Sequence, residues 1–101
     1  MWFVLLNLAA AADDTEALYE EHCQVCHGKN GRATFPGVMM SAGSFASERF
    51  WRDRPQERLR ETIVKGGEAM GLKKAMPAFG ETLTEPQIDA LLAYALAFRE
   101  P

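Results

Sequence analysis

The sequence has few cysteines, few histidines and no long apolar run, and each shortage narrows the class of protein. Two cysteines among 101 residues allow at most one disulfide, so a fold that depends on several disulfides is excluded. The apolar N-terminal stretch, residues 1–12, is shorter than the about 20 residues that a membrane-spanning helix needs. No basic tract is present and the net charge is −3, so nothing favours a nucleic-acid partner. We expect one small domain with no transmembrane segment.

The N-terminal stretch is predicted to be a targeting segment. Its apolar residues end in alanines before Asp13 and Asp14, which is typical of a secretory signal and its cleavage end. The positive residues that usually precede such a signal are missing, so a retained apolar segment remains an alternative. We expect residues 1–12 to be a signal-peptide remnant or apolar segment and residues 13–101 to form the domain. Export is expected, to the periplasm or elsewhere outside the cytoplasm.

Helical signals run through the chain, and no stretch shows the alternation of a β-strand. A first helix is predicted from residues 13–14 to 27, ended by glycines at 28 and 31. Residues 28–55 are predicted to be mainly loop, with one short helix that Ser47 caps. A further helix is predicted from residue 55 or 56 to Lys65, and the last begins at a capping box of Thr84 and Gln87.

The stretch CQVCHG carries the clearest chemistry. On a helix, residues three and four apart share a face, so Cys23, Cys26 and His27 can all reach one flat group. C-x-x-C-H is the attachment pattern of c-type haem, in which both thiols add to vinyl groups and the histidine binds iron. A redox dithiol, a zinc site and a structural disulfide are the alternatives. The first lacks a strand–helix–strand context, the second lacks a fourth good ligand, and the third would constrain little.

A haem iron in an electron carrier usually takes a second axial ligand, and none lies near the motif. The other histidine, His22, adjoins Cys23 and points elsewhere, so the methionines are the candidates. Met76 is favoured because Pro77 biases it toward an extended backbone on a stiff loop. Met70, in a flexible stretch, is the alternative. Methionines 39 and 40 are interpreted as core filler.

The sequence resembles the class I, monohaem cytochrome c family. "LYEEHCQVCHGKNG" is similar to that family's N-terminal helix and haem-attachment turn. "MPAFGETLTEPQIDALLAYAL" is similar to its methionine-ligand loop and C-terminal helix. The two stretches make up about a third of the chain, and the order of features fits from Asp13 onward. The joint match is more specific than either half.

The resemblance implies an all-α fold of three to five helices around one haem c, in which the N- and C-terminal helices cross. Tyr19 and Tyr94 are expected near that crossing. The resemblance also implies that the carbonyl oxygen of Pro36 accepts a hydrogen bond from His27, which would fix the ring; a simple turn role is the alternative. It further implies an electron carrier with one haem, covalent through Cys23 and Cys26, whose iron lies between His27 and Met76.

The middle segment departs from the best-known members of that family. Trp51 is expected to touch the haem or the core. Nearby arginines are expected either to bind the haem propionates or, as is favoured for any single one, to pair with Glu48, Asp53 and Glu57 in solvent. The arginines concerned are Arg49, Arg52, Arg54, Arg58 and Arg60.

No nucleophile–base pair and no acid–base carboxylate pair is recognisable, so the sequence does not predict an enzyme. We expect a monomer that docks transiently with redox partners at the exposed haem edge. Lysines near the motif and the Met76 loop either form a basic rim there or are ordinary solubilising residues. These are Lys29, Lys65, Lys73 and Lys74. A haem domain or subunit of a larger oxidoreductase, and a haem sensor or peroxidase-like protein with a labile sixth ligand, are the alternatives.

Overall fold

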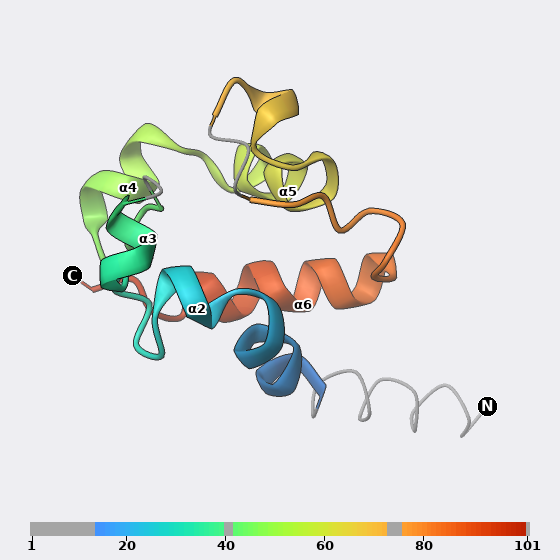
Figure 1. The fold of residues 1–101 in the computed structure, drawn as a ribbon, viewed down its shortest axis with the longest axis horizontal. Coiled ribbons are helices and arrows are strands. Elements are labelled where there is room, and N and C mark those ends of the chain that lie inside the picture. The colour runs from blue at the N-terminus through green and yellow to red at the C-terminus, as the bar shows by residue number, and fades with distance from the viewer. Residues whose placement is uncertain (1–13, 40–41, 73–75, 101) are drawn as a thin grey trace.

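The computed structural model describes residues 14–39, 42–72 and 76–100, and the regular structure in these ranges is helical. Figure 1 shows the arrangement of the elements. Helical residues 14–22 are followed by α2 (Gln24–His27), α3 (Phe35–Met39), α4 (Glu48–Asp53), α5 (Gln56–Lys65), the 3-10 helix η1 (Glu68–Met70) and α6 (Glu85–Leu96). The predicted all-α class is confirmed. The segment predicted to be a targeting remnant, residues 1–12, lies outside the described residues.

Helix α6 begins at the capping box that the sequence predicts. The Thr84 hydroxyl accepts a hydrogen bond from the Gln87 backbone N–H at 3.2 Å, and the Gln87 side-chain oxygen accepts one from the Thr84 N–H at 2.8 Å. Two N–H groups that the first helical turn cannot satisfy thereby gain partners. Pro86 lies in the first turn, where its missing N–H costs nothing.

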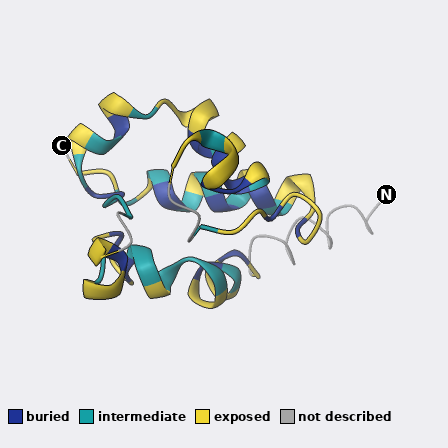
Figure 2. Cartoon of the chain, turned by 45° about the horizontal axis from the view of Figure 1, so that its top comes forward, coloured by how far each residue is buried: buried dark blue, intermediate teal, exposed yellow. Residues whose placement is uncertain are grey.

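The main core lies between α5 and α6. Leu59 and Ile63 on α5 are buried in the same apolar cluster as Ile88 and Leu91 on α6. In Figure 2 the buried faces of both helices, dark blue, turn toward the middle of the molecule. At the surface, an ion pair of 2.7 Å between Arg60 and Asp89 joins the two helices. Residues four apart on α5 and three apart on α6 thus form one apolar face on each helix.

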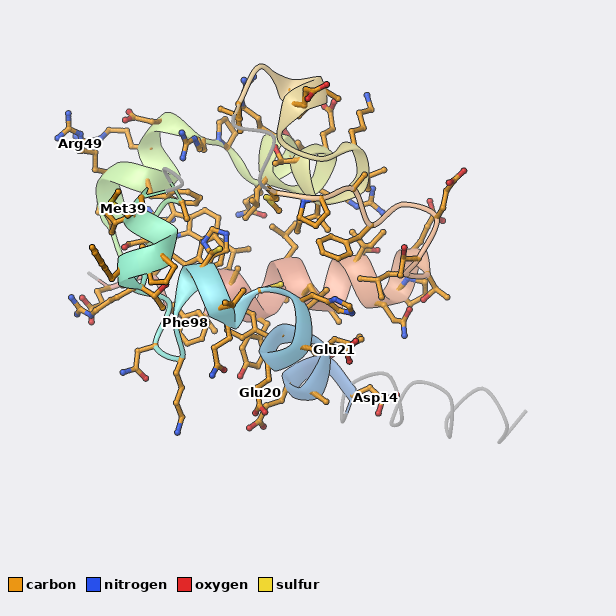
Figure 3. The ribbon with its side chains drawn as sticks, viewed as in Figure 1. Asp14, Glu20, Glu21, Met39, Arg49 and Phe98 are labelled. Atoms are coloured by element: carbon orange, nitrogen blue, oxygen red, sulfur yellow. The ribbon has the colours of Figure 1, made fainter. Side chains whose placement is uncertain are left out.

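The N-terminal helical segment packs against the C-terminal part of α6 and the turn that follows it. The Tyr19 ring is 1% exposed, and its centroid lies 4.8 Å from that of Tyr94 and 5.5 Å from that of Phe98. Figure 1 shows this segment passing beside α6. The expectation that Tyr19 and Tyr94 pack where the terminal helices meet is confirmed. Asp14, Glu20 and Glu21 lie on the same segment (Figure 3) and are exposed.

The first helix differs from its prediction because it is interrupted. Residues 14–22 are helical, Cys23 forms a turn, and α2 restarts at Gln24. The backbone N–H groups of Cys26 and His27 both donate to the carbonyl of Cys23, at 3.3 and 2.9 Å. Gly28, at φ 81°, then ends α2, as the glycine at that position predicts. The prediction of one continuous helix was therefore wrong at Cys23.

The second difference is α3, which lies inside the stretch predicted to be mainly loop. The Thr34 hydroxyl accepts a hydrogen bond from the Gly37 N–H at 3.1 Å at the start of the helix. Gly37 is buried against α2, and a Cβ there would collide with the carbonyl oxygen of Cys26. The helix presents its other side chains outward, so Met39, which was expected to fill the core, is 69% exposed. Met40 lies outside the described residues.

Within the described ranges, no helix combines the length and the apolar character that crossing a bilayer requires.

The Thr84 cap generates a stability prediction. Thr84→Ala removes the side-chain acceptor at the start of α6 and is expected to lower the free energy of unfolding by about 1 kcal/mol. Chemical denaturation followed by circular dichroism measures it. Thr82→Ala, at an exposed residue two positions earlier, is the matched control and should stay within about 0.5 kcal/mol of the parent. Equal losses in both variants would contradict the capping role.

Candidate functional site

The three residues of the motif lie together at α2, as the sequence predicts. Cys23 stands at the N-cap, Cys26 lies inside the helix, and His27 is the last helical residue. All three side chains are half-buried, and both cysteines are free thiols. Cys23 also packs against the apolar core cluster. The short helix therefore holds two thiols and one imidazole at the edge of the core.

Burial determines the state of the first thiol. It raises the pKa of Cys23 to about 11, so this group is a protonated thiol at neutral pH. Disulfide exchange and zinc binding both use the thiolate, so this environment does not favour a redox dithiol or a zinc site. Among residues 14–39, 42–72 and 76–100, no three His, Cys, Asp or Glu side chains come together as a metal-binding cluster.

The His27 ring is held by the carbonyl of Gly43. Its Nδ1 lies 2.9 Å from that oxygen, and because a carbonyl can only accept, Nδ1 carries the proton. Burial lowers the pKa of His27, the hydrogen bond to Gly43 acts in the opposite direction, and the positive charge of Arg54 lowers the pKa further. A neutral ring with its proton on Nδ1 presents the lone pair of Nε2, the form in which histidine binds metals.

The partner of the His27 ring differs from the predicted one, Pro36. Pro36 is the second residue of α3 and is exposed. The chain at Pro36 forms the start of a helix and not the expected loop, whereas the later loop around Gly43 approaches the ring. In this structure the hydrogen bond of Nδ1 therefore goes to Gly43, sixteen residues along the chain from His27.

A second contact to the ring was missed by the sequence analysis. The Phe45 ring stacks on the imidazole of His27, with centroids 4.2 Å apart and planes 17° apart. Gly43 and Phe45 lie in a loop, so helical periodicity does not relate either residue to the motif. The glycine and serines around them indicate only a loop.

The two methionines considered as ligands lie in different surroundings. Met76 is half-buried and packs against the apolar core cluster, and its carbonyl oxygen accepts a hydrogen bond from the Gly67 N–H at 2.9 Å. Met70, at the end of η1, lines an open cleft of about 730 Å³ together with charged residues of the α4–α5 region, and its carbonyl oxygen accepts a hydrogen bond from Arg58. Only Met76 of this pair is part of the apolar core packing.

Trp51 was predicted to touch either the haem or the core, and in the structure it belongs to the core. It is 6% exposed, and its indole N–H donates to the carbonyl of Phe45 at 2.6 Å. The predicted ion pair between Glu48 and the arginines of its own segment was wrong. The Glu48 carboxylate is bound on both oxygens by Arg99, at 2.8 and 2.9 Å, because the turn after α6 brings that side chain to α4.

The arginines of the middle segment have separate surroundings. Arg60 pairs with Asp89, and Arg58 donates to the carbonyl of Met70 at 3.3 Å. Arg54 is half-buried and lies 5.3 Å from the centre of the Phe50 ring. Arg49, labelled in Figure 3, and its neighbour Arg52 are exposed. Arg54 is thus the member of this group whose charge influences His27.

The residues present fit a haem attached through the motif. Two accessible thiols three residues apart can form the two thioethers, and an imidazole fixed through Nδ1 can bind iron through Nε2. Met76, packed on the apolar cluster, has a thioether, a soft donor group of the kind that haem iron can take. The donor set therefore matches the chemistry that the sequence indicates.

Comparison with known proteins agrees with this chemistry. The family described as "Cytochrome C oxidase, cbb3-type, subunit III" matches residues 10–94. A protein named cytochrome c6, from Gracilaria tenuistipitata var. liui, is 26% identical over 93 residues, which is 92% of this chain and 78% of that protein. The solved structure of the KustC0563 c-type cytochrome has a TM-score of 0.72 and 32% identity, over 86% of this chain and 99% of that one. A point mutant of the same cytochrome has a TM-score of 0.70 and 31% identity, over 85% and 99%.

The contact between Gly43 and Phe50 generates a prediction for this site. A Cβ at Gly43 would collide with the Phe50 ring, so Gly43→Ala is expected to lower the free energy of unfolding by about 1–3 kcal/mol. Denaturant unfolding measures the loss. Phe50→Leu makes room, so adding Gly43→Ala to that background should cost clearly less than in the parent chain. An equal cost in both backgrounds would exclude the clash as its cause.

Proposed function

This chain belongs to the c-type cytochromes, in the family described as cytochrome C oxidase, cbb3-type, subunit III, and we propose that it carries electrons on a haem held between His27 and Met76. Membership of the family implies one covalently bound haem c with its iron and a role in electron transfer. The haem supplies the one-electron couple. This chain would supply the attachment, two ligands to the iron and the surroundings that set how easily the iron is reduced.

The observation that supports the proposal most is the state of the His27 ring. The hydrogen bond from Nδ1 to the Gly43 carbonyl fixes the tautomer and leaves the lone pair of Nε2 free for a ligand, and such a bond also raises the basicity of the coordinating nitrogen. Cys23, at the N-cap of α2, and Cys26, inside α2, precede it and are the proposed tethers. Met76 is the proposed sixth ligand because its side chain belongs to the apolar core packing and that of Met70 lines a charged cleft.

An iron with both axial positions filled by protein needs little rearrangement when its charge changes, which suits electron transfer. A thioether ligand and an apolar surround disfavour the extra positive charge of ferric iron, so we expect a positive reduction potential. No catalytic residue is needed for this role, and we propose that the protein is not itself an enzyme.

The partners are proposed to be redox proteins that dock transiently at the haem edge of a monomer, in the periplasm or elsewhere outside the cytoplasm. Residues 13–101 are the proposed cytochrome domain. Of the lysines suggested for a basic rim, Lys29 is exposed and Lys65 is 3.3 Å from the Glu61 carboxylate. Lys73 and Lys74 lie outside the described residues. The relative named cytochrome c6 supports redox partners for this chain.

A second candidate is a haem subunit or domain of a larger oxidoreductase. The observation that favours it is the description of the matching family, which names a subunit of a cytochrome C oxidase. In that role the same His27 and Met76 ligation would pass electrons inside a complex. Size-exclusion chromatography of the native extract separates the two: elution near 11.2 kDa supports the free carrier, and co-elution with a larger haem protein supports the subunit.

The tethers are tested by attachment. Replacing both Cys23 and Cys26 by alanine is expected to abolish covalent haem, because no thiol remains to add to the vinyl groups. Protein expressed with a cytochrome c maturation system is denatured, extracted with acidified organic solvent and measured as the pyridine haemochrome. The parent chain should retain one haem per chain after extraction. A colourless parent protein would end the proposal.

The sixth ligand is tested by carbon monoxide. Met76→Leu is expected to leave the iron open, so that the reduced variant binds CO rapidly and stoichiometrically at neutral pH. The parent protein and the matched control Met70→Leu should not. If the parent itself binds CO in this way, the sensor or peroxidase-like alternative holds instead. If only Met70→Leu opens the site, the ligand is Met70.

A further inference from the structure

The loop between α3 and α4 holds the His27 imidazole from two directions. The carbonyl oxygen of Gly43 accepts a hydrogen bond from the Nδ1–H group at 2.9 Å. Phe45, two residues later, covers one face of the ring at 4.2 Å between centroids, with the planes within 17° of parallel. The hydrogen bond alone fixes the position of Nδ1 but allows the imidazole to turn about the N–H···O direction. The stacked ring opposes that turn.

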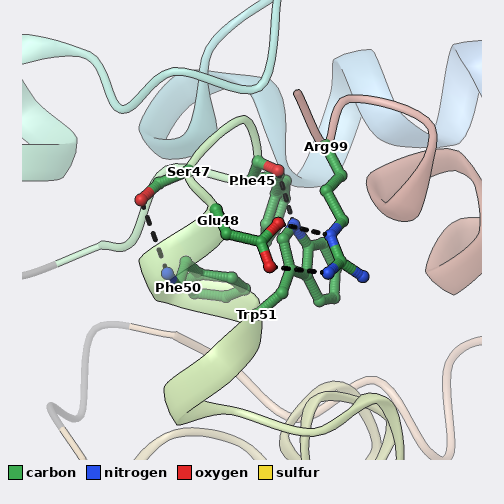
Figure 4. Close-up of polar contacts among 6 residues, drawn as sticks. All are labelled: Phe45, Ser47, Glu48, Phe50, Trp51 and Arg99. Atoms are coloured by element: carbon green, nitrogen blue, oxygen red, sulfur yellow. Dashed lines mark hydrogen bonds and ion pairs between the residues drawn. The ribbon is translucent and has the colours of Figure 1, made fainter. Parts of the chain in front are cut away.

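Phe45 is itself held in place on several sides. It is 4% exposed, and its ring meets Phe50 edge-on at 5.3 Å and lies 6.0 Å from the Trp51 ring. Its carbonyl accepts the Trp51 indole N–H at 2.6 Å, as Figure 4 shows. Its own N–H donates to the carbonyl of Gly31 at 2.6 Å. The Phe45 ring therefore has a position set by α4 and by the turn after α2.

Helix α4, which carries Phe50 and Trp51, is anchored to the rest of the fold. Ser47 caps it by accepting from the Phe50 N–H at 3.4 Å, and Glu48 is bound on both oxygens by Arg99 (Figure 4). The Glu100 N–H donates to the carbonyl of Ala46 at 3.1 Å. The support of the imidazole thus extends from the loop through α4 to the C-terminal turn.

We propose that Phe45, supported by Trp51 and Phe50, is a positioning residue that fixes the plane of the His27 imidazole on the haem iron. This inference rests on the proposed function, since it assigns Phe45 a role only if His27 binds iron. The direction of the imidazole plane determines which iron d orbital overlaps the ring π system. It therefore determines how unpaired spin spreads over the haem in the ferric protein. In this role Phe45 acts through its contact with His27.

The experiment is proton NMR of the ferric, haem-loaded protein, in which the chemical shifts of the haem methyl groups report the direction of the axial imidazole plane. Phe45→Leu keeps an apolar side chain but removes the stacked ring, so the spread of the methyl shifts is expected to change. Phe45→Tyr keeps the ring and should retain the parent pattern. Phe98→Leu is the matched control, because its ring packs on Tyr19 and Tyr94 and not on His27. It should lower the melting temperature and leave the methyl pattern as in the parent.

Trp51→Phe gives a second test: it keeps the Phe45 ring and removes the indole N–H bond to the Phe45 carbonyl together with part of the packed indole ring. Trp51→Phe should move the methyl shifts in the same direction as Phe45→Leu, but by less. If Phe45→Leu does not fold, Trp51→Phe by itself tests the inference. A parent-like methyl pattern in a folded, haem-loaded Phe45→Leu or Trp51→Phe protein overturns the inference. An equal change in Phe98→Leu overturns it too, because any core loosening would then have the same effect. Failure of the proposed function is distinguishable, since the parent protein would then carry no haem or would show a spectrum without histidine ligation.

Discussion

The packing of Tyr19 is the interaction on which the arrangement of this small fold most depends. Its ring is enclosed between the N-terminal helical segment and the aromatic side chains of α6 and the following turn. Its hydroxyl donates to the carbonyl of Gly28 at 2.7 Å, the residue that ends α2. Burial raises the pKa of Tyr19, so the donor proton is retained throughout the physiological range. Tyr19 therefore links the contact between the N-terminal helical segment and α6 to the end of α2, the helix that carries the motif.

The motif helix needs such support because it is only four residues long and has no fully buried side chain. Its position comes from neighbours: Tyr19 at its end, Gly37 of α3 against Cys26, and the core contact of Cys23. Each contact replaces stability that the helix itself cannot supply. The same arrangement leaves the thiols and the imidazole near the surface of the core, where a large flat cofactor can be attached and can then complete the packing.

The ligand ring is held by a part of the chain that carries no motif. Gly43 and Phe45 belong to a loop, and the loop is positioned by α4, which is in turn tied to Arg99. A loop can hold a functional ring firmly when it is connected to rigid elements at both ends. Gly43 is suited to its place because a side chain there would collide with Phe50. The aromatic cluster thus serves both as core and as support for the proposed iron ligand.

Local signals in the sequence predicted the helical class, the caps at Ser47 and Thr84, and the grouping of Cys23, Cys26 and His27, because each depends on residues within one or two turns. Only the tertiary structure decided which carbonyl meets His27, which ring covers it, and that Glu48 pairs with Arg99. These contacts join residues 16 to 51 positions apart. Loop geometry and packing bring such residues together, and no sequence period encodes either.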